Sequence, residues 1–357
     1  MNGPRTERPV GVALVGTGKW ATQIVAAAGR AGLRVVTCFS RDPDRRRLFA
    51  ERAGCGAAPS LPAALEHPEV EGALILTPND THLDVALACA QRGLGVFVEK
   101  PISDTVADAE RMAAACADAG VALMVGHGFR RLGAARRVGE LIASGALGRV
   151  VLAEANLSLP GALTPEQPPS TALPGHTPSW GKPGGPWRAH RERNPGGPLM
   201  QLGIHHVDTL ASWLGPPVAA TGRFAHLETE ADIDDVGVVC LRMASGSLAA
   251  VTGSYVSPKT FAIRLTGTRA VLDYRADFGI WPAAERMDAA TALTLDGAPV
   301  AFEERDMLAE ELAELGRCVR GEAEPETGAA EGIAALRAIR DALDAAAEDR
   351  AWEPTPH

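Results

Sequence analysis

A glutamate and a lysine stand side by side where a predicted strand ends. The apolar run GVFV at 95–98 is followed by Glu99, Lys100 and Pro101. Such a run is typical of a buried strand, and proline has no N–H to donate to a strand ladder, so the strand should stop there. A lysine fixed at a strand end could stabilise a developing oxyanion. The alternative is a surface lysine paired with the neighbouring glutamate, and these residues alone leave both interpretations open.

A second group of polar residues lies within a predicted helix over 197–215. Gln201, His205 and Asp208 are spaced i, i+4, i+7, so an α-helix would place them on one face while leucines face the core. Imidazole titrates near neutrality, which makes His205 a candidate proton donor and acceptor. A solitary histidine on a helix is more often structural, and we interpret His206 in that way.

A glycine-rich turn joins the first predicted strand to the first predicted helix. The segment GTGKWA at 16–21 matches the pattern G-x-G-x-x-A, in which Gly16 permits a tight turn, Gly18 admits the pyrophosphate and Ala21 packs the helix on the sheet. The phosphates would bind at the helix N-terminus. The alternative is a turn without a ligand. The other expected cofactor-binding residues here are Thr17, Lys19 and Trp20.

The end of the second predicted strand bears on which nucleotide is bound. NAD sites usually carry an acidic residue there, whereas this strand ends with Ser40 and Arg41. A hydroxyl and a guanidinium suit a 2'-phosphate, so we prefer NADP(H). Asp42 keeps NAD(H) possible. The arginines at 45–47 could reinforce the phosphate site, but a solvated helix face is the simpler interpretation.

The elements that position these residues fall into two patterns. Residues 1–126 alternate strands with helices, among them a helix expected to be capped by Ser103, and this predicts a doubly wound parallel sheet of the Rossmann type. Residues 127–357 combine helices with strands joined by short turns, which predicts an α+β domain with an open, mainly antiparallel sheet. The Pro- and Gly-rich stretch 160–186 predicts a long ordered loop or lid.

The composition of the chain bears on its binding partners, its metal and disulfide content and its compartment. The chain has 357 residues and a formal net charge of -9, which disfavours nucleic-acid and membrane partners. The six cysteines have no C-x-x-C spacing, so we expect neither a disulfide framework nor a metal site. The start is polar, and no run of 18 apolar residues occurs, so we expect a cytoplasmic protein.

Four motifs in one order resemble the glucose–fructose oxidoreductase, inositol dehydrogenase and rhizopine-catabolism (Gfo/Idh/MocA) family of nicotinamide-dependent enzymes. They are GTGKWA at 16–21, TPNDTH at 77–82, EKP at 99–101 and GGPLMQLGIHHVD at 196–208. The resemblance extends over essentially the whole chain.

The resemblance implies roles for the residues at the strand ends. Lys100 would contact both the substrate and the nicotinamide ribose, and its charge would stabilise a developing alkoxide. Pro101 would hold it in place, and we expect the Lys100–Pro101 bond to be cis. The other residues expected to contact the cofactor here are Thr77, Pro78, Asn79, His82 and Glu99.

The resemblance also implies that His205 is the general acid and base. Gln201 stands where inositol dehydrogenase-like members carry aspartate, and it can hydrogen-bond a sugar hydroxyl but adds no charge, which disfavours an inositol-type substrate. Asp208 would bind substrate or orient His205. Weaker candidates for substrate binding are His127, Arg131, Trp187 and Arg188.

We therefore expect an NAD(P)-dependent oxidoreductase that acts on a secondary hydroxyl, or the matching ketone, of a sugar, cyclitol or related polyol. One alternative is a redox-assisted elimination or hydrolysis in which a sugar is oxidised transiently. Another is a redox-silent regulatory protein that binds a dinucleotide. The family resemblance also implies a homo-oligomer, either a dimer or a tetramer.

Overall fold

The computed structural model describes residues 8–159, 189–276 and 287–348. Contacts within the chain divide it into two compact units. The first unit comprises residues 1–103, 107–126 and 306–329. The second comprises residues 104–106, 127–305 and 330–357. The expected boundary at residue 126 stays a prediction, and the contacts add the late segment 306–329 to the first unit.

The first unit contains a six-stranded parallel sheet with the strand order β3-β2-β1-β4-β5-β6. This is the strand order of dinucleotide-binding folds, and it confirms the expected Rossmann architecture. Strands β1, β4, β5 and β6 are buried along their whole length, as expected of strands covered on both faces. The strands are β1 (Val10–Val15), β2 (Leu33–Phe39), β3 (Gly56–Ala57), β4 (Gly72–Ile75), β5 (Gly95–Val98) and β6 (Leu123–Val125).

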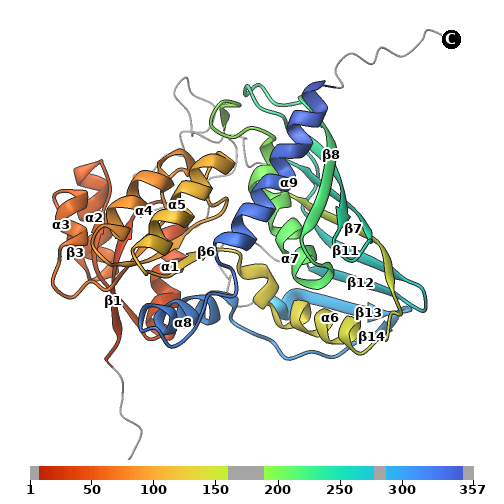
Figure 1. The fold of residues 1–357 in the computed structure, drawn as a ribbon, viewed down its shortest axis with the longest axis horizontal. Helices are drawn as coiled ribbons and strands as arrows, with labels where there is room; N and C mark the ends of the chain where they lie inside the picture. The colour runs from red at the N-terminus through yellow and green to blue at the C-terminus, as the bar shows by residue number, and fades with distance from the viewer. Residues whose placement is uncertain (1–7, 160–188, 277–286, 349–357) are drawn as a thin grey trace, which may run out of the picture. The chain divides into compact units, whose positions relative to one another are not determined.

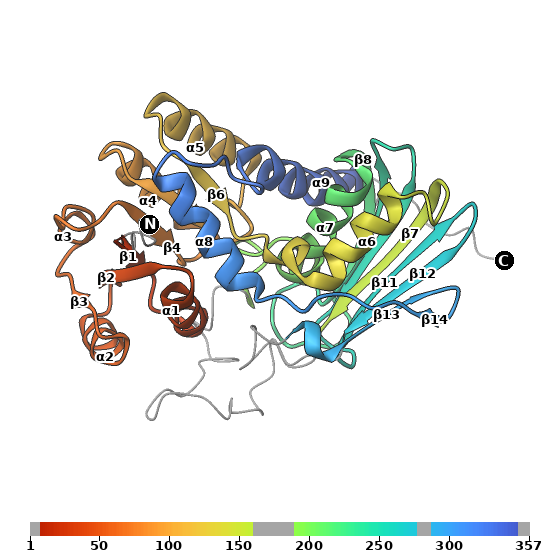
Figure 2. The ribbon, with the colours of Figure 1, turned by 90° about the horizontal axis from the view of Figure 1, so that it is seen from below.

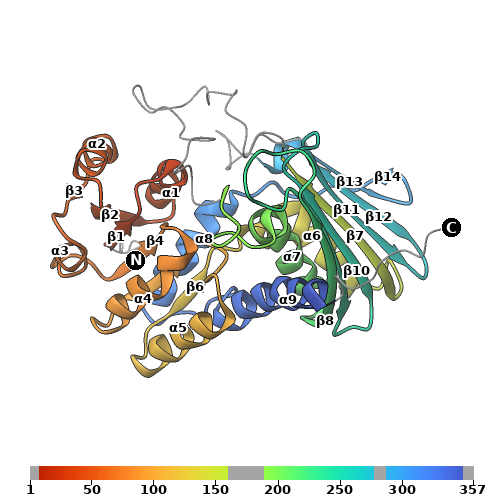
Figure 3. The ribbon, with the colours of Figure 1, turned by 90° about the horizontal axis from the view of Figure 1, so that it is seen from above.

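Helices cover both faces of this sheet. Helices α1 and α8 lie on one face and α4 and α5 on the other (Figures 2 and 3). The helices of this unit are α1 (Lys19–Arg30), α2 (Pro43–Ala53), α3 (Leu61–Leu65), α4 (His82–Ala90), α5 (Val106–Asp118) and α8 (Met307–Val319), with a 3₁₀ turn η1 (Asn79–Thr81). Helix α5 begins at Val106, two residues later than a cap at Ser103 predicts, since Asp104 and Thr105 lie between them.

Local signals account for the ends of α2. The Asp42 side chain accepts a hydrogen bond from the backbone N–H of Arg45, and Pro43 occupies the first turn. Gly54 ends the helix in the left-handed region at φ 66°, which costs glycine no steric penalty.

Helix α8 comes from the far end of the chain and packs tightly on the first sheet. A Cβ atom added at Gly95 would lie 2.7 Å from a methyl carbon of Val319, so glycine is needed for this close approach. Beyond the helix, the Thr327 hydroxyl donates to the Val125 carbonyl at 2.7 Å, and the Val125 N–H donates to the Thr327 carbonyl at 2.7 Å. The segment 306–329 therefore packs on the first sheet at β5 and is hydrogen-bonded to its edge strand β6.

The second unit is built on an eight-stranded sheet with the order β14-β13-β12-β11-β7-β10-β9-β8. All neighbouring strands are antiparallel except the parallel pair β7 and β10, which confirms the expected open, mainly antiparallel sheet. The strands are β7 (Val150–Ser158), β8 (Pro217–Ala225), β9 (Val236–Met243), β10 (Leu248–Ser254), β11 (Thr260–Gly267), β12 (Val271–Ala276), β13 (Thr291–Leu295) and β14 (Ala298–Pro299).

The helices of the second unit gather on one face of its sheet (Figures 1 and 2). Within the described parts of the chain, no helix lies on the other face. Buried and exposed residues accordingly alternate along β9. The helical elements are η2 (Gly128–Arg131), α6 (Gly133–Ala143), a π-helix η4 (Leu199–Gly203), α7 (Ile204–Leu214), η6 (Asp288–Ala290) and α9 (Ala329–Glu348).

Candidate functional site

The turn between β1 and α1 has the geometry that a bound pyrophosphate requires. Gly16 has φ 105°, and a Cβ atom there would lie 2.6 Å from the Leu76 carbonyl oxygen, so only glycine fits. At Gly18, by contrast, no heavy atom lies within 4 Å of an added Cβ, and no side chain caps α1. The helix therefore presents its first N–H groups toward open space, where an anion can bind.

The end of β2 places a hydroxyl and an arginine beside this turn. The Thr17 hydroxyl donates to the Ser40 hydroxyl at 3.0 Å, which fixes the position of that side chain. Arg46 donates to the Ser40 carbonyl at 2.7 Å and lies over the Phe39 ring. Arg41 is exposed and forms no hydrogen bond or ion pair with any described residue. Its guanidinium is therefore available to a phosphate from outside the protein.

The Glu99–Lys100 pair at the end of β5 is connected to the glycine-rich turn. The Trp20 indole donates to one carboxylate oxygen of Glu99, and the Lys100 backbone N–H donates to the other at 3.2 Å. The Lys100–Pro101 peptide bond is cis, as expected. A Cβ atom at Gly126 would lie 3.3 Å from the Glu99 carboxyl carbon, so β6 also approaches this carboxylate closely.

The TPNDTH segment follows β4 at the same edge of the sheet. The Thr81 hydroxyl lies 2.8 Å from that of Thr77 and 2.7 Å from the Pro78 carbonyl. His82 is fully buried, and its ring nitrogens lie 2.9 Å from the Thr77 carbonyl and 3.2 Å from that of Ile102. Burial lowers the pKa of His82, and the neighbouring backbone carbonyls of Thr77 and Ile102 partly offset this effect. Asn79 is also buried.

In the second unit, His205 lies near the start of α7 and is half-buried. Its imidazole stacks on the Phe129 ring, with ring centroids 4.1 Å apart and an interplanar angle of 12°. Phe129 belongs to η2, between the two residues of this segment that the sequence had suggested as substrate contacts, His127 and Arg131. No motif or spacing in the sequence singles out Phe129.

Asp208 lies one turn after His205, and its carboxylate is bound by a second residue that the sequence did not single out. Arg130 donates to its two oxygens at 2.9 and 2.5 Å, and both side chains are buried. The neighbouring Arg131 is fully buried and donates to the His127 carbonyl at 3.1 Å. The predicted roles of these residues toward substrate stay predictions.

Gln201 does not lie in a regular α-helix as expected. Residues Leu199–Gly203 form a π-helix, whose wider turn breaks the i, i+4 spacing between Gln201 and His205. The Gln201 side-chain amide donates to Asn194 at 3.1 Å, and both residues are buried. Asn194 is a further residue that the sequence analysis missed, although its place before two glycines marked an irregular segment.

His206 is structural, as interpreted from the sequence. It is fully buried, and its Nε2 atom lies 3.1 Å from the Asn156 carbonyl. Burial lowers its pKa to about 4. Trp187, Arg188 and the proposed lid at 160–186 lie outside the described residues, so their predicted roles stay predictions.

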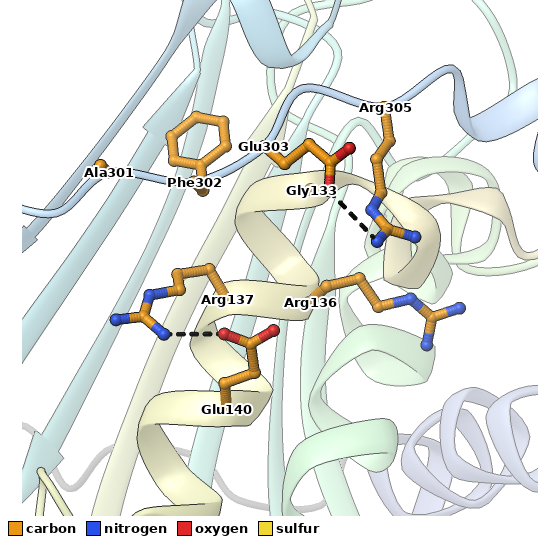
Figure 4. Close-up of a pocket in the computed structure, with 8 residues that line it drawn as sticks. All are labelled: Gly133, Arg136, Arg137, Glu140, Ala301, Phe302, Glu303 and Arg305. Atoms are coloured by element: carbon orange, nitrogen blue, oxygen red, sulfur yellow. Dashed lines mark hydrogen bonds and ion pairs between the residues drawn. The ribbon is translucent and has the colours of Figure 1, made fainter.

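A pocket of about 270 Å³ lies beside α6, and none of the residues predicted from the sequence lines it (Figure 4). Arg137 and Glu140 pair across 2.7 Å, and Arg305 lies 3.7 Å from Glu303. The pocket is therefore a surface feature with paired charges. Its remaining lining residues are Gly133, Arg136, Ala301 and Phe302.

Two kinds of feature are absent from the described residues: a membrane-spanning helix and a cluster of metal ligands. No helix in residues 8–159, 189–276 or 287–348 is both long and apolar enough to cross a bilayer. Over the same ranges, no three histidine, cysteine or acidic side chains gather as metal ligands would.

A Rossmann sheet with an open glycine-rich turn, followed by a unit with an open mixed sheet, defines a nicotinamide-dependent oxidoreductase. Residues 10–127 match the oxidoreductase family with an NAD-binding Rossmann fold, and residues 135–273 match the Gfo/Idh/MocA C-terminal domain. The chain belongs to the Gfo/Idh/MocA family.

Individual relatives extend over nearly the whole chain. The D-xylose 1-dehydrogenase [NADP(+)] of Haloarcula marismortui is 26% identical and covers 95% of this chain and 92% of its own length. A candidate NADPH-dependent oxidoreductase from Desulfitobacterium hafniense is 32% identical, with a TM-score of 0.87 over 96% of this chain and 97% of its own. The aldose-aldose oxidoreductase of Caulobacter crescentus is 25% identical, with a TM-score of 0.77 over 96% and 99%.

Proposed function

We propose that this chain transfers a hydride between NADP(H) and a secondary hydroxyl, or the matching ketone, of a sugar, cyclitol or related polyol. One observation carries the proposal: the uncapped N-terminus of α1 lies beside an exposed Arg41 that has no partner among the described residues. The names of the Haloarcula marismortui and Desulfitobacterium hafniense relatives, which specify NADP(+) and NADPH, support the same cofactor.

Residues at the ends of β1, β2, β4 and β5 would hold the cofactor. The N–H groups at the start of α1 would bind the pyrophosphate, and Ser40 and Arg41 would bind the 2'-phosphate. The nicotinamide, when bound, supplies the acceptor or donor of the hydride. NAD(H) remains the second candidate, because Asp42 is close in sequence to the ribose position.

Side chains of the protein would transfer the proton and stabilise the developing negative charge. When an alcohol is oxidised, its O–H proton passes to the His205 imidazole, while the carbon gives up its hydrogen with two electrons and a C=O bond forms. The Lys100 ammonium would stabilise the negative charge that develops on the oxygen. Gln201 would recognise a hydroxyl group of the substrate, since its amide both donates and accepts.

The first test identifies the nucleotide. The purified protein is denatured and any released nucleotide is identified by mass spectrometry; if none is released, NADPH and NADH are titrated by fluorescence. We expect NADP(H) to be retained or bound more tightly. A clear preference for NADH would overturn the cofactor assignment, and binding of neither would overturn the proposed function.

Turnover measurements distinguish the proposed function from the two alternatives. A panel of aldoses, ketoses and polyols is offered with NADP⁺ or NADPH, and net change in absorbance at 340 nm is followed. Redox-assisted elimination would consume substrate without net NADPH change. A regulatory protein would bind nucleotide but turn over nothing, and the presence of both Lys100 and His205 argues against it.

The proposal also assigns a role to each part of the chain and an oligomeric state. Residues 1–126 would bind the cofactor, and residues 127–357 would bind the substrate and form a homo-oligomer in the cytoplasm. Leu248 is 58% exposed and stands beside the exposed Leu152 on the helix-free face of the second sheet. Neighbouring large apolar side chains exposed on one sheet face would suit an interface between copies of the chain. Light scattering after size exclusion would give the order of the oligomer.

A further inference from the structure

The rings of Phe129 and His205 are nearly parallel, and their centroids are closer than those of most aromatic pairs. Neutral aromatic rings favour an offset or edge-to-face arrangement with centroids about 4.5–7 Å apart. Here the centroids are 4.1 Å apart and the planes differ by 12°. A ring face carries negative charge density, so this arrangement favours a cationic partner over a neutral one. The geometry therefore suits an imidazole that becomes an imidazolium.

Phe129 cannot easily move away from this position. The next residue, Arg130, forms two hydrogen bonds to Asp208, which lies one turn beyond His205 on α7. The Phe129 ring is 6% exposed, and it also contacts Phe261, with centroids 5.7 Å apart. Two adjacent residues of η2 are thus fixed against two residues of α7.

A stacked aromatic partner matters because the χ2 torsion of histidine is otherwise only weakly restricted. The χ2 angle of histidine has a broad, roughly two-fold distribution, so the backbone of α7 alone does not select the plane of the imidazole. A general base must point one nitrogen at the proton that it removes. A rigid ring that covers one face of the imidazole removes most of this freedom.

We propose that Phe129 is a positioning residue for the reaction: it sets the plane of the His205 imidazole and favours its protonated form after proton transfer. This inference rests on the proposed role of His205 as general acid and base. Phe129 itself touches neither substrate nor cofactor in the proposal, and it acts only through the histidine.

The test compares Phe129→Leu with Phe261→Leu and Phe129→Tyr. Phe261 is the comparison residue: it is equally buried and contacts Phe129 as a tilted pair at 5.7 Å, but its own histidine contact is with His206 at 4.9 Å, so its loss should affect His205 less. Phe129→Tyr keeps a ring on His205. The probe is diethyl pyrocarbonate, which modifies neutral imidazole, and peptide mass spectrometry follows His205 as a function of pH. Circular dichroism checks folding, and Phe129→Met replaces the leucine variant if that does not fold.

We expect Phe129→Leu to move the midpoint of His205 modification down by about half a pH unit, as expected for a cation–π contact of modest strength. Its kcat should fall about tenfold, with KM changed less than about twofold, on the sugar found by the panel. Phe129→Tyr should restore both. Equal effects of Phe129→Leu and Phe261→Leu would overturn the positioning role.

The failure of the underlying function gives a different result. If His205→Asn retains turnover, the assignment of the base is wrong and the positioning role falls with it. If His205→Asn is inactive while Phe129→Leu keeps the wild-type kcat and modification midpoint, only the positioning role is overturned.

Discussion

The candidate residues of the two units are held in different ways. In the first unit the groups expected to bind phosphate are open to a ligand, since Arg41 is exposed and the start of α1 is uncapped. In the second unit two residues expected to bind substrate are held in buried side-chain contacts, Asp208 by Arg130 and Gln201 by Asn194. Substitutions in the first unit should therefore mainly affect binding and chemistry, whereas those in the second should also affect stability.

The largest effects are expected from Lys100→Ala in the first unit and His205→Ala in the second. Each should lower kcat by about 10²- to 10⁴-fold, because each removes a group that acts on the transferred proton or the developing charge. Steady-state kinetics on the best sugar of the panel would measure this loss. If neither variant changes kcat by more than a few-fold, both assignments are wrong. Only His205→Ala should also lower the melting temperature, since it leaves Phe129 without its stacked partner.

Asp208→Ala should be the most destabilising single change in the second unit. It leaves the Arg130 guanidinium buried without its carboxylate, at a cost of about 3–5 kcal/mol of unfolding free energy. Urea denaturation followed by circular dichroism measures this cost. The matched control is Arg264→Ala, which breaks the exposed pair with Asp273 on β11 and β12 and should cost less than about 1 kcal/mol. Equal losses would contradict the difference between buried and exposed pairs.

His206 should make the stability of the second unit depend on pH. Its pKa is about 4 in the folded chain against 6.5 in the unfolded one, so the unfolded chain binds the proton first as pH falls. The free energy of unfolding should therefore decrease between pH 6.5 and about 4, by about 3 kcal/mol in total. Denaturation curves at several pH values test this. In His206→Gln, whose amide can still donate to Asn156, the decrease should be shallower; an unchanged slope would exclude His206 as its source.

Arg41→Ala should give the smallest effect, and one confined to binding. Loss of a charge-assisted contact to the 2'-phosphate should weaken NADPH binding about tenfold and leave NADH binding unchanged. Paired fluorescence titrations measure both. Arg47→Ala is the control, because Arg47 already pairs with Glu51 at 3.1 Å on the exposed face of α2. A tenfold loss in both variants would place the phosphate along α2 instead.

The first unit could be predicted from the sequence because local signals determine it. Alternating apolar runs and helices specify the parallel sheet, and Gly16 marks a turn whose geometry only glycine allows. For the second sheet, short strands and tight turns allowed only its class to be predicted, an open and mainly antiparallel sheet. The start of α5 was placed two residues too early, since Ser103 is a good cap by type but the helix begins at Val106.

The side-chain contacts of the second unit could not be predicted in this way. Arg130 and Asp208 are 78 positions apart, and nothing in either residue's neighbourhood specifies the other. The same holds for Phe129 and His205. The π-helix was also missed, because a hydrophobic period of 3.6 predicts a regular helix and does not reveal a wider turn.

Helix α8 has a consequence for how this chain is made. The sheet of the first unit is covered on one face by α1 together with a helix that begins only at Met307, and Gly95 is shaped to receive Val319. A ribosome synthesises residues 127–305 of the second unit before it supplies that cover. The nascent Rossmann sheet must therefore remain incomplete, with apolar surface exposed to chaperones, for most of translation. A minimal nucleotide-binding fragment would need residues 8–126 joined to residues 306–329.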